Sequence, residues 1–137
     1  MSRRDTSHET VRLSLERDGW TITHDPYPIR LGDLPMGIDL GAEKLIAADR
    51  QDRKIAVEIK SFVKTSDLST FHTALGQYLN YQFALDEADP ERSLYLAVPT
   101  ETWKSFFARP AIRQVCVRYG VKVLVFSVDA EIVSWIE

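Results

Sequence analysis

Two short apolar runs that each contain charged residues constrain the fold of this chain more than any other feature. Residues 38–40, Ile-Asp-Leu, place one acid inside an apolar run, and residues 55–61 place a Glu-x-Lys pair inside a second. Side chains alternate between the two faces of a strand, so Glu58 and Lys60 share one face and the apolar residues beside them share the other. The sequence therefore predicts two strands on which two carboxylates and a lysine converge beside a core.

These residue types suit metal-dependent hydrolysis of phosphodiesters. Asp39 and Glu58 are candidate ligands of a hard divalent cation, Mg²⁺ or Mn²⁺, which prefers oxygen donors, and the carbonyl of Ile59 is a third candidate. Lys60 is a candidate for stabilising negative charge or orienting the attacking water. The alternative is a solvated Glu-x-Lys pair, in which the ion pair adds little stability. That alternative is the commoner meaning of the tripeptide alone, and the presence of Asp39 favours a site.

A long helix is predicted after the second strand, from Ser66 or Asp67 to about Glu87. Gln77 and Tyr81 are four residues apart, so they share a helical face and would line a cleft, contacting a phosphate or holding the lysine. The alternative for both is packing and helix solubility. The expected apolar face of this helix consists of Leu68, Phe71, Leu75, Tyr78, Leu79 and Leu85. Gly76 lies inside the helix at a cost of about 1 kcal/mol relative to alanine, which indicates close packing or a close backbone approach.

An acid, then Glu-x-Lys, then a helix with Gln-x-x-x-Tyr resembles the PD-(D/E)XK nuclease superfamily, and within it the branch with a Gln-x-x-x-Tyr helix. Ile38 stands where the superfamily usually has a proline before the first acid. Longer segments resemble the XisH family, the fdxN element excision controlling factor proteins, and the match runs from about His8 to Trp135. The segments that carry this resemblance are residues 20–26, 39–48, 56–62, 71–81 and 94–99.

The resemblance implies one nuclease-like domain over residues 1–137, a role in programmed DNA rearrangement or on mobile elements, and a small XisI-type partner. Two functions remain open. The chain is a Mg²⁺-dependent endonuclease that uses Asp39, Glu58 and Lys60, or it is a catalytically silent regulatory module that helps a site-specific recombinase excise DNA. The superfamily often has a glutamate on its first helix, which makes Glu9 a cleft candidate; a solvated first-turn acid is the alternative. A homodimer also remains open.

Composition limits these possibilities further. A net charge of −3 argues against strong nonspecific binding to nucleic acid by the chain alone, because phosphate binding relies on lysine and arginine. No run approaches the roughly 18 apolar residues of a membrane span, and no signal peptide is expected. The single Cys116 forms no internal disulfide, which fits a cytoplasmic protein. The scattered His8, His24 and His72 predict no structural zinc site, and none of them is assigned to the cleft.

The remaining pattern predicts an α/β sandwich, restriction-endonuclease-like, with a central mixed β-sheet flanked by helices. Prolines and glycines between residues 26 and 37 predict a loop, and residues 51–53 predict a polar turn. Counting from that turn pairs Asp39 beyond Lys60, so a twist or bulge would be needed to bring the acids together. The predicted strands are 20–23, 38–49, 54–61, 94–98, 121–128 and 131–136. The other predicted helices run from Thr6 or Ser7 to Asp18, from Pro99 through Phe107, and from about Ala111 to Tyr119.

Overall fold

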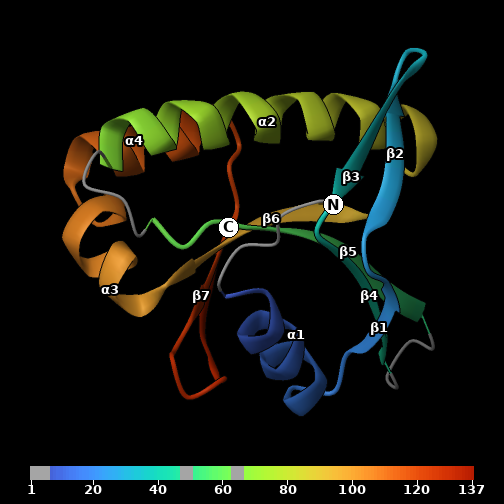
Figure 1. Cartoon of the computed structure of the whole chain (residues 1–137), viewed down its shortest axis with the longest axis horizontal. Helices are drawn as coiled ribbons and strands as arrows, with labels where there is room; N and C mark the ends of the chain where they lie inside the picture. Colours follow the sequence, from blue (N-terminus) through green and yellow to red (C-terminus); the bar gives the residue numbers. More distant parts are fainter. Residues whose placement is uncertain (1–6, 47–50, 63–66) are drawn as a thin grey trace.

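The computed structural model describes residues 7–46, 51–62 and 67–137 (Figure 1). Three expectations lie outside the described residues: helix starts at Thr6 and at Ser66, and the strand end at residues 47–49. Six strands form one mixed sheet in the order β1-β4-β5-β6-β7-β8. Their bounds are β1 Thr21–His24, β4 Leu40–Ile46, β5 Gln51–Ile59, β6 Ser93–Pro99, β7 Val123–Phe126 and β8 Ile132–Ile136. The pairs β5–β6 and β6–β7 are parallel, and the other pairs are antiparallel.

Helices cover both faces of this sheet (Figure 1). α1 (His8–Arg17) packs on one face. α2 (Asp67–Ala88) lies across the other face and links β5 to β6, because parallel neighbours need a long crossover. After β6 the chain forms α3 (Thr100–Thr102), a π-helical turn η1 (Trp103–Phe107) and α4 (Pro110–Arg118). The predicted α/β sandwich with a central mixed sheet is confirmed.

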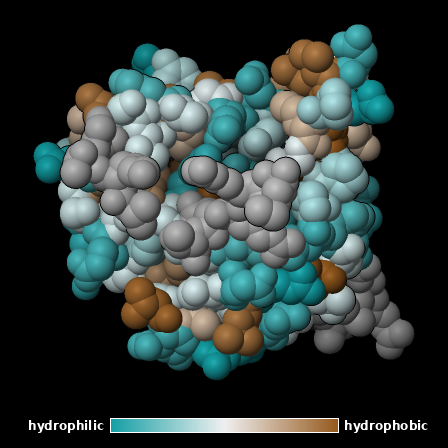
Figure 2. Space-filling view, viewed as in Figure 1, coloured by the Kyte–Doolittle hydropathy of each residue, from teal (hydrophilic) through white to brown (hydrophobic). Residues whose placement is uncertain are grey.

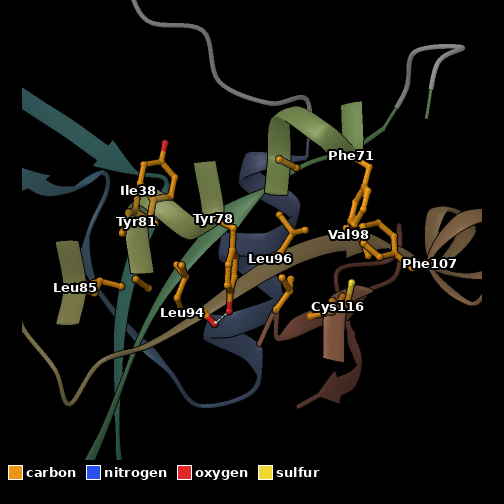
Figure 3. Packing of buried hydrophobic residues seen from close by; sticks show 14 of the residues in the cluster. Ile38, Phe71, Tyr78, Tyr81, Leu85, Leu94, Leu96, Val98, Phe107 and Cys116 are labelled. Atoms are coloured by element: carbon orange, nitrogen blue, oxygen red, sulfur yellow. Dashed lines mark hydrogen bonds between the residues drawn. The ribbon is translucent and has the colours of Figure 1, made fainter. Parts of the chain in front are cut away.

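β5 lies between two apolar cores and is buried on both faces. Ala56 joins the core beneath α2, in which Tyr78 donates a hydrogen bond to the carbonyl of Leu94 at 2.8 Å (Figure 3). Val57 joins the core beneath α1, as do the residues two positions before and after it. Even-numbered residues of β5 therefore face α2. This alternation places Glu58 on the α2 side, at the end of the strand.

The long helix was predicted well in extent and less well in its buried face. Its buried residues are Phe71, Ala74, Tyr78, Tyr81, Ala84 and Leu85. Leu68 and Leu79, which were expected in the core, are 55% and 40% exposed. Leu79 follows the buried Tyr78 and is turned about 100° away from it around the helix axis, since one turn takes 3.6 residues. Neither α2 nor any other helix within the described ranges has the length and apolar character needed to cross a membrane.

The loop expected between residues 26 and 37 is wrong, because this segment forms a hairpin of β2 (Tyr27–Leu31) and β3 (Leu34–Ile38). The hairpin stands as an arm beside the C-terminal half of α2 (Figure 1). Pro28 pairs with Gly37 and Pro35 pairs with Arg30. In a hairpin with a two-residue loop these are the pairs without ladder hydrogen bonds, so the prolines remove no bond from the ladder. Apolar atoms reach the surface at the tip of the arm (upper right in Figure 2), where Leu34 is 60% exposed.

Two glycines have opposite surroundings, and the expectation of close packing at Gly76 is wrong. A Cβ atom added at Gly76 would meet no other atom within 4 Å. A Cβ atom at Gly41 would lie 2.9 Å from Cδ2 of Tyr27 and 3.2 Å from the Cβ of His24. β4 can therefore approach the arm only because position 41 has no side chain.

We expect Gly76→Ala to raise the free energy of unfolding by about 0.5–1 kcal/mol, because alanine reduces the backbone entropy lost in a helix. Gly41→Ala is expected to lower it by about 1–3 kcal/mol through overpacking. Urea unfolding followed by circular dichroism measures both. A loss of stability in Gly76→Ala would show that this side of α2 is covered.

Candidate active site

The register of β4 and β5 brings the two predicted acids together. The strands pair from Leu40 with Val57 to Ile46 with Gln51. Extending this register by one residue places Asp39 opposite Glu58. The predicted offset between the acids is wrong, because the chain reverses between residues 46 and 51 and not at residues 51–53.

Hydrogen bonds fix Asp39 and Glu58 against each other at the ends of their strands. The backbone N–H of Ile59 donates to Oδ2 of Asp39 at 2.8 Å. The backbone N–H of Asp39 donates to Oε1 of Glu58 at 3.3 Å. Nζ of Lys60 lies 3.8 Å from Oε2 of Glu58, with the lysine side chain 23% exposed. The structure therefore brings together the three residues that the sequence singles out.

Asp39 can reach this position because the chain bends there. The predicted strand from residue 38 was wrong at this point: β3 ends at Ile38, β4 begins at Leu40, and Asp39 lies in a bend between them. Ile38 packs in the core beneath α2, whereas Leu40 packs in the core beneath α1. The bend interrupts the strand ladder and leaves the Asp39 carboxylate to accept the Ile59 N–H in place of a backbone carbonyl.

Ile59 contributes its backbone to the site. The N–H of Lys60 donates to the carbonyl of Ala97 in β6 at 3.0 Å. Successive residues of a strand direct their N–H and C=O groups to opposite edges, so Ile59 directs both of its backbone groups away from β6. The N–H of Ile59 accordingly meets Asp39, and its carbonyl faces the same side of the strand. Its side chain is buried in the core beneath α1, so the carbonyl is the group that can join a metal site.

The acids carry more negative charge than the nearby side chains offset. Glu58 is only 8% exposed, and its pKa is raised to about 8. Burial is the largest cause, followed by the charge of Asp39; Lys60 and the hydrogen bond from the Asp39 backbone act in the opposite direction. A divalent cation would supply the missing positive charge, and carboxylate and carbonyl oxygens are ligands that Mg²⁺ and Mn²⁺ accept. The residues present therefore fit such an ion.

Tyr81 reaches the acids from α2. It is 8% exposed and lies beside Ile38 (Figure 3). Its pKa is raised to about 12, first by burial and then by the negative charges of Glu58 and Asp39. Its phenol therefore stays protonated and can donate a hydrogen bond. Gln77 lies one turn earlier on the same helix, and its buried Oε1 has no hydrogen-bond partner in the part of the chain that the structure describes.

Glu9, the further cleft candidate, forms a group with His8 and Asp25. Its carboxylate lies within 4.8 Å of the ligand atoms of His8 and Asp25, and within the described ranges no such group of three contains both Asp39 and Glu58. His8 is buried, with Nε2 2.8 Å from Oδ1 of Asp25, and Arg12 donates to the other Asp25 oxygen. This network ties α1 to the end of β1. The sequence left His8 unassigned and offered no signal that Asp25 would join it.

Two further residues support the strand end, and sequence reasoning missed both. The hydroxyl groups of Ser61 and Ser7 are hydrogen-bonded at 2.8 Å, so Ser7 contacts the segment that follows β5, and its side chain does not cap α1. Phe62 has a φ of 57°, which is uncommon for a residue with a side chain. Its ring packs edge-on against Phe107 at 5.3 Å between ring centroids. The cluster of aromatic residues near position 106 was the available sequence signal for this packing of Phe62.

Comparisons with known proteins give a consistent result. A family model described as XisH protein matches residues 1–134. Among solved structures, the chain is similar to an XisH family protein from Nostoc punctiforme PCC 73102, with 42% identity and a TM-score of 0.86, covering 97% of this chain and 100% of that chain. It is also similar to a fdxN element excision controlling factor protein from Anabaena variabilis, with 44% identity and a TM-score of 0.85, covering 98% and 100%. No curated protein matches the chain.

Proposed function

The chain belongs to the XisH family, and on that premise we propose that it is a DNA-excision controlling factor with a metal-dependent, PD-(D/E)XK-type endonuclease site. The family membership supports the first part, because one similar structure is described as a fdxN element excision controlling factor protein. The geometry around Asp39 supports the second part.

One observation carries the nuclease proposal. Two carboxylates are fixed against each other by the bonds from Ile59 and Asp39, and Glu58 is held where burial and a second acid oppose its ionisation. A structural ion pair needs no second carboxylate, and burying one without a matching cation is unfavourable. Pairs of buried carboxylates with a raised pKa occur most often at functional sites.

In this mechanism Asp39 and Glu58, with the Ile59 carbonyl, would hold Mg²⁺ or Mn²⁺. When bound, such an ion would supply Lewis acidity and would lower the pKa of water at the site. Lys60 places an ammonium beside Glu58, where it stabilises the charge that develops on the phosphate. Tyr81 offers a protonated phenol on the α2 side, and the Gln77 amide on the same helix face would contact a phosphate or hold Lys60. Water would attack the phosphorus and pass one proton to solvent, while the P–O bond to one deoxyribose oxygen breaks and that oxygen takes a proton and leaves as a hydroxyl.

The alternative is a catalytically silent module that assists a site-specific recombinase together with a small XisI-type partner in the cytoplasm. The net charge of −3 favours it, because an acidic chain holds DNA weakly on its own. In both versions the partner would help to hold DNA. The two proposals differ in whether the chain itself hydrolyses a phosphodiester.

The deciding experiment incubates the purified chain with supercoiled, linear and branched DNA in Mg²⁺ or Mn²⁺, with and without the XisI-type partner. The matched variant combines Asp39→Asn with Glu58→Gln, which preserves the shape of both side chains and removes both charges. Cleavage by the native chain that is lost in this variant supports the nuclease. If the native chain cleaves none of these substrates in either cation, even with the partner, the silent module stands.

A further inference from the structure

The β2–β3 arm carries an apolar face that extends past the helix covering it. Directly paired residues of the two strands share one face of the hairpin, and so do alternate residues along each strand. One face consists of three pairs without a charge: Tyr27 with Ile38, Ile29 with Met36, and Leu31 with Leu34. Ile29 and Ile38 are buried in the core beneath α2, whereas Leu34 at the tip is 60% exposed. The last apolar pair therefore reaches solvent beyond the cover that α2 provides.

A groove of about 650 Å³ lies between the arm and the C-terminal half of α2. Its lining is mostly apolar and includes Met36 from the arm and Phe83 from α2, whose side chain is 60% exposed. Arg30 of the arm and Glu87 of α2 also line the groove, and both are exposed. No ion pair joins this base to this acid among the residues that the structure describes. The groove thus combines an apolar lining with one base on the arm and one acid on the helix.

The arm has reason to associate with another surface. It forms a two-stranded sheet of its own, outside the six-stranded sheet (Figure 1). A two-stranded hairpin gains little stability from its own contacts and depends on packing against other elements. Contact at the tip would remove the exposed side chain of Leu34 from water, which is favourable in proportion to the apolar area covered.

A second copy of this chain matches this end of the molecule in shape and in charge. The arm tip protrudes and is apolar, and the groove beside it is concave and apolar. Arg30 and Glu87 have opposite charges, so each can meet the other across an interface. A two-fold axis uses every such match twice, because each copy contributes the same patch to the interface. A partner with a single sign of charge would match only one of the two residues.

We propose that two copies of this chain associate through their arms about a two-fold axis. The tip of each arm, at Leu34, enters the groove of the other copy and packs on Phe83, and Arg30 of each copy pairs with Glu87 of the other. The groove lining and the arm tip amount to about a dozen residues per copy. Standard interfaces use about 20–30 residues a side and reach micromolar to picomolar affinity, so we expect a micromolar dissociation constant.

The dimer would also fix the two candidate active sites relative to each other. β3 ends at Ile38, directly before Asp39, so the arm is continuous with the segment that carries this acid. The dimer itself does not depend on the nuclease proposal, because none of its contacts involves a metal or a phosphodiester.

The test is sedimentation velocity of the full chain from about 1 µM to about 200 µM, without metal or DNA, which brackets a micromolar constant. Leu34→Asp is expected to raise the dissociation constant by about 30-fold or more, because it would bury a carboxylate in the apolar groove. Val117→Asp, at an apolar residue of α4 that is 68% exposed, is the matched control and should leave the constant unchanged. Thermal melting confirms that each variant is folded.

A charge exchange tests the pairing across the interface. Arg30→Glu and Glu87→Arg each place like charges opposite one another, so each is expected to weaken the dimer about tenfold. The double variant carries opposite charges again, with their sides exchanged, and should dimerise nearly as well as the native chain.

Three results would overturn the inference. The first is a native chain that stays monomeric over the whole range, and the second is a dimer that Leu34→Asp leaves unchanged. The third is a double variant that dimerises no better than the single variants, because Arg30 and Glu87 would then not meet across the interface. DNA cleavage enters none of these measurements, so a failure here is distinguishable from a failure of the proposed function.

Discussion

Lys60→Ala is expected to lower metal-dependent DNA cleavage by about 10²–10³-fold while the fold remains intact. Its ammonium lies 3.8 Å from Glu58 and is the cation that opposes the raised pKa of that residue. Removing one electrostatic group that acts on a developing charge typically has an effect of this size. The lysine side chain is only 23% exposed, so alanine also removes packed methylene groups, and the stability of the variant has to be measured beside its activity. Single-turnover rates at saturating Mg²⁺ measure the loss, and circular dichroism melting checks the fold.

Lys54→Ala is the matched control, because Lys54 is also a partly exposed lysine, lies within β5 and pairs with Glu43 away from the acids. It should cleave at the native rate. Equal rates for native and Lys60→Ala protein would contradict the assigned role of this lysine, and cleavage that persists in EDTA would contradict the metal-dependent mechanism.

The affinity for Mg²⁺ is expected to fall by up to about tenfold for each unit that the pH drops below about 8. Burial and the charge of Asp39 raise the pKa of Glu58 to about 8, so its carboxyl is protonated below that pH. A metal ligand must be ionised, so binding of the cation has to displace this proton. Lower pH favours the protonated acid and therefore weakens metal binding. Calorimetric titrations between about pH 6 and pH 9 measure the slope and the release of about one proton per ion.

Glu58→Gln is the variant that isolates this effect. The amide has nearly the shape of the acid and no proton to release in this range. Metal binding should become weak, and its remaining dependence on pH should be shallow. An affinity of the native chain that stays constant between about pH 6 and pH 8 would show that Glu58 is not a ligand.

The local part of the candidate site was predictable because it depends on short spacings. Strand alternation puts Glu58 and Lys60 on one face, and a helical turn aligns Gln77 with Tyr81. The meeting of Asp39 with Glu58 was harder, because it depends on where the chain reverses. Moving that point changes the register of every pair between the strands. The sequence around residue 51 reads as a turn, although the strand already begins there.

Long-range features could not be predicted. The β2–β3 arm was missed because prolines usually exclude a strand, whereas Pro28 and Pro35 occupy positions that need no ladder N–H. The group of His8, Glu9 and Asp25 depends on how α1 lies against β1, which no local pattern specifies.

The carboxyl at position 58 has a consequence for the evolution of this protein. Its pKa is raised from 4.5 to about 8, so the folded chain holds the proton more tightly than the unfolded chain does, and the ion-free protein loses stability as the pH rises across that interval. A neutral residue there would remove this loss. In a lineage that no longer needed hydrolysis, mutation and selection would therefore replace Glu58 before the apolar residues around it. If the nuclease proposal holds, the residue at this position would then distinguish family members that hydrolyse DNA from members that do not.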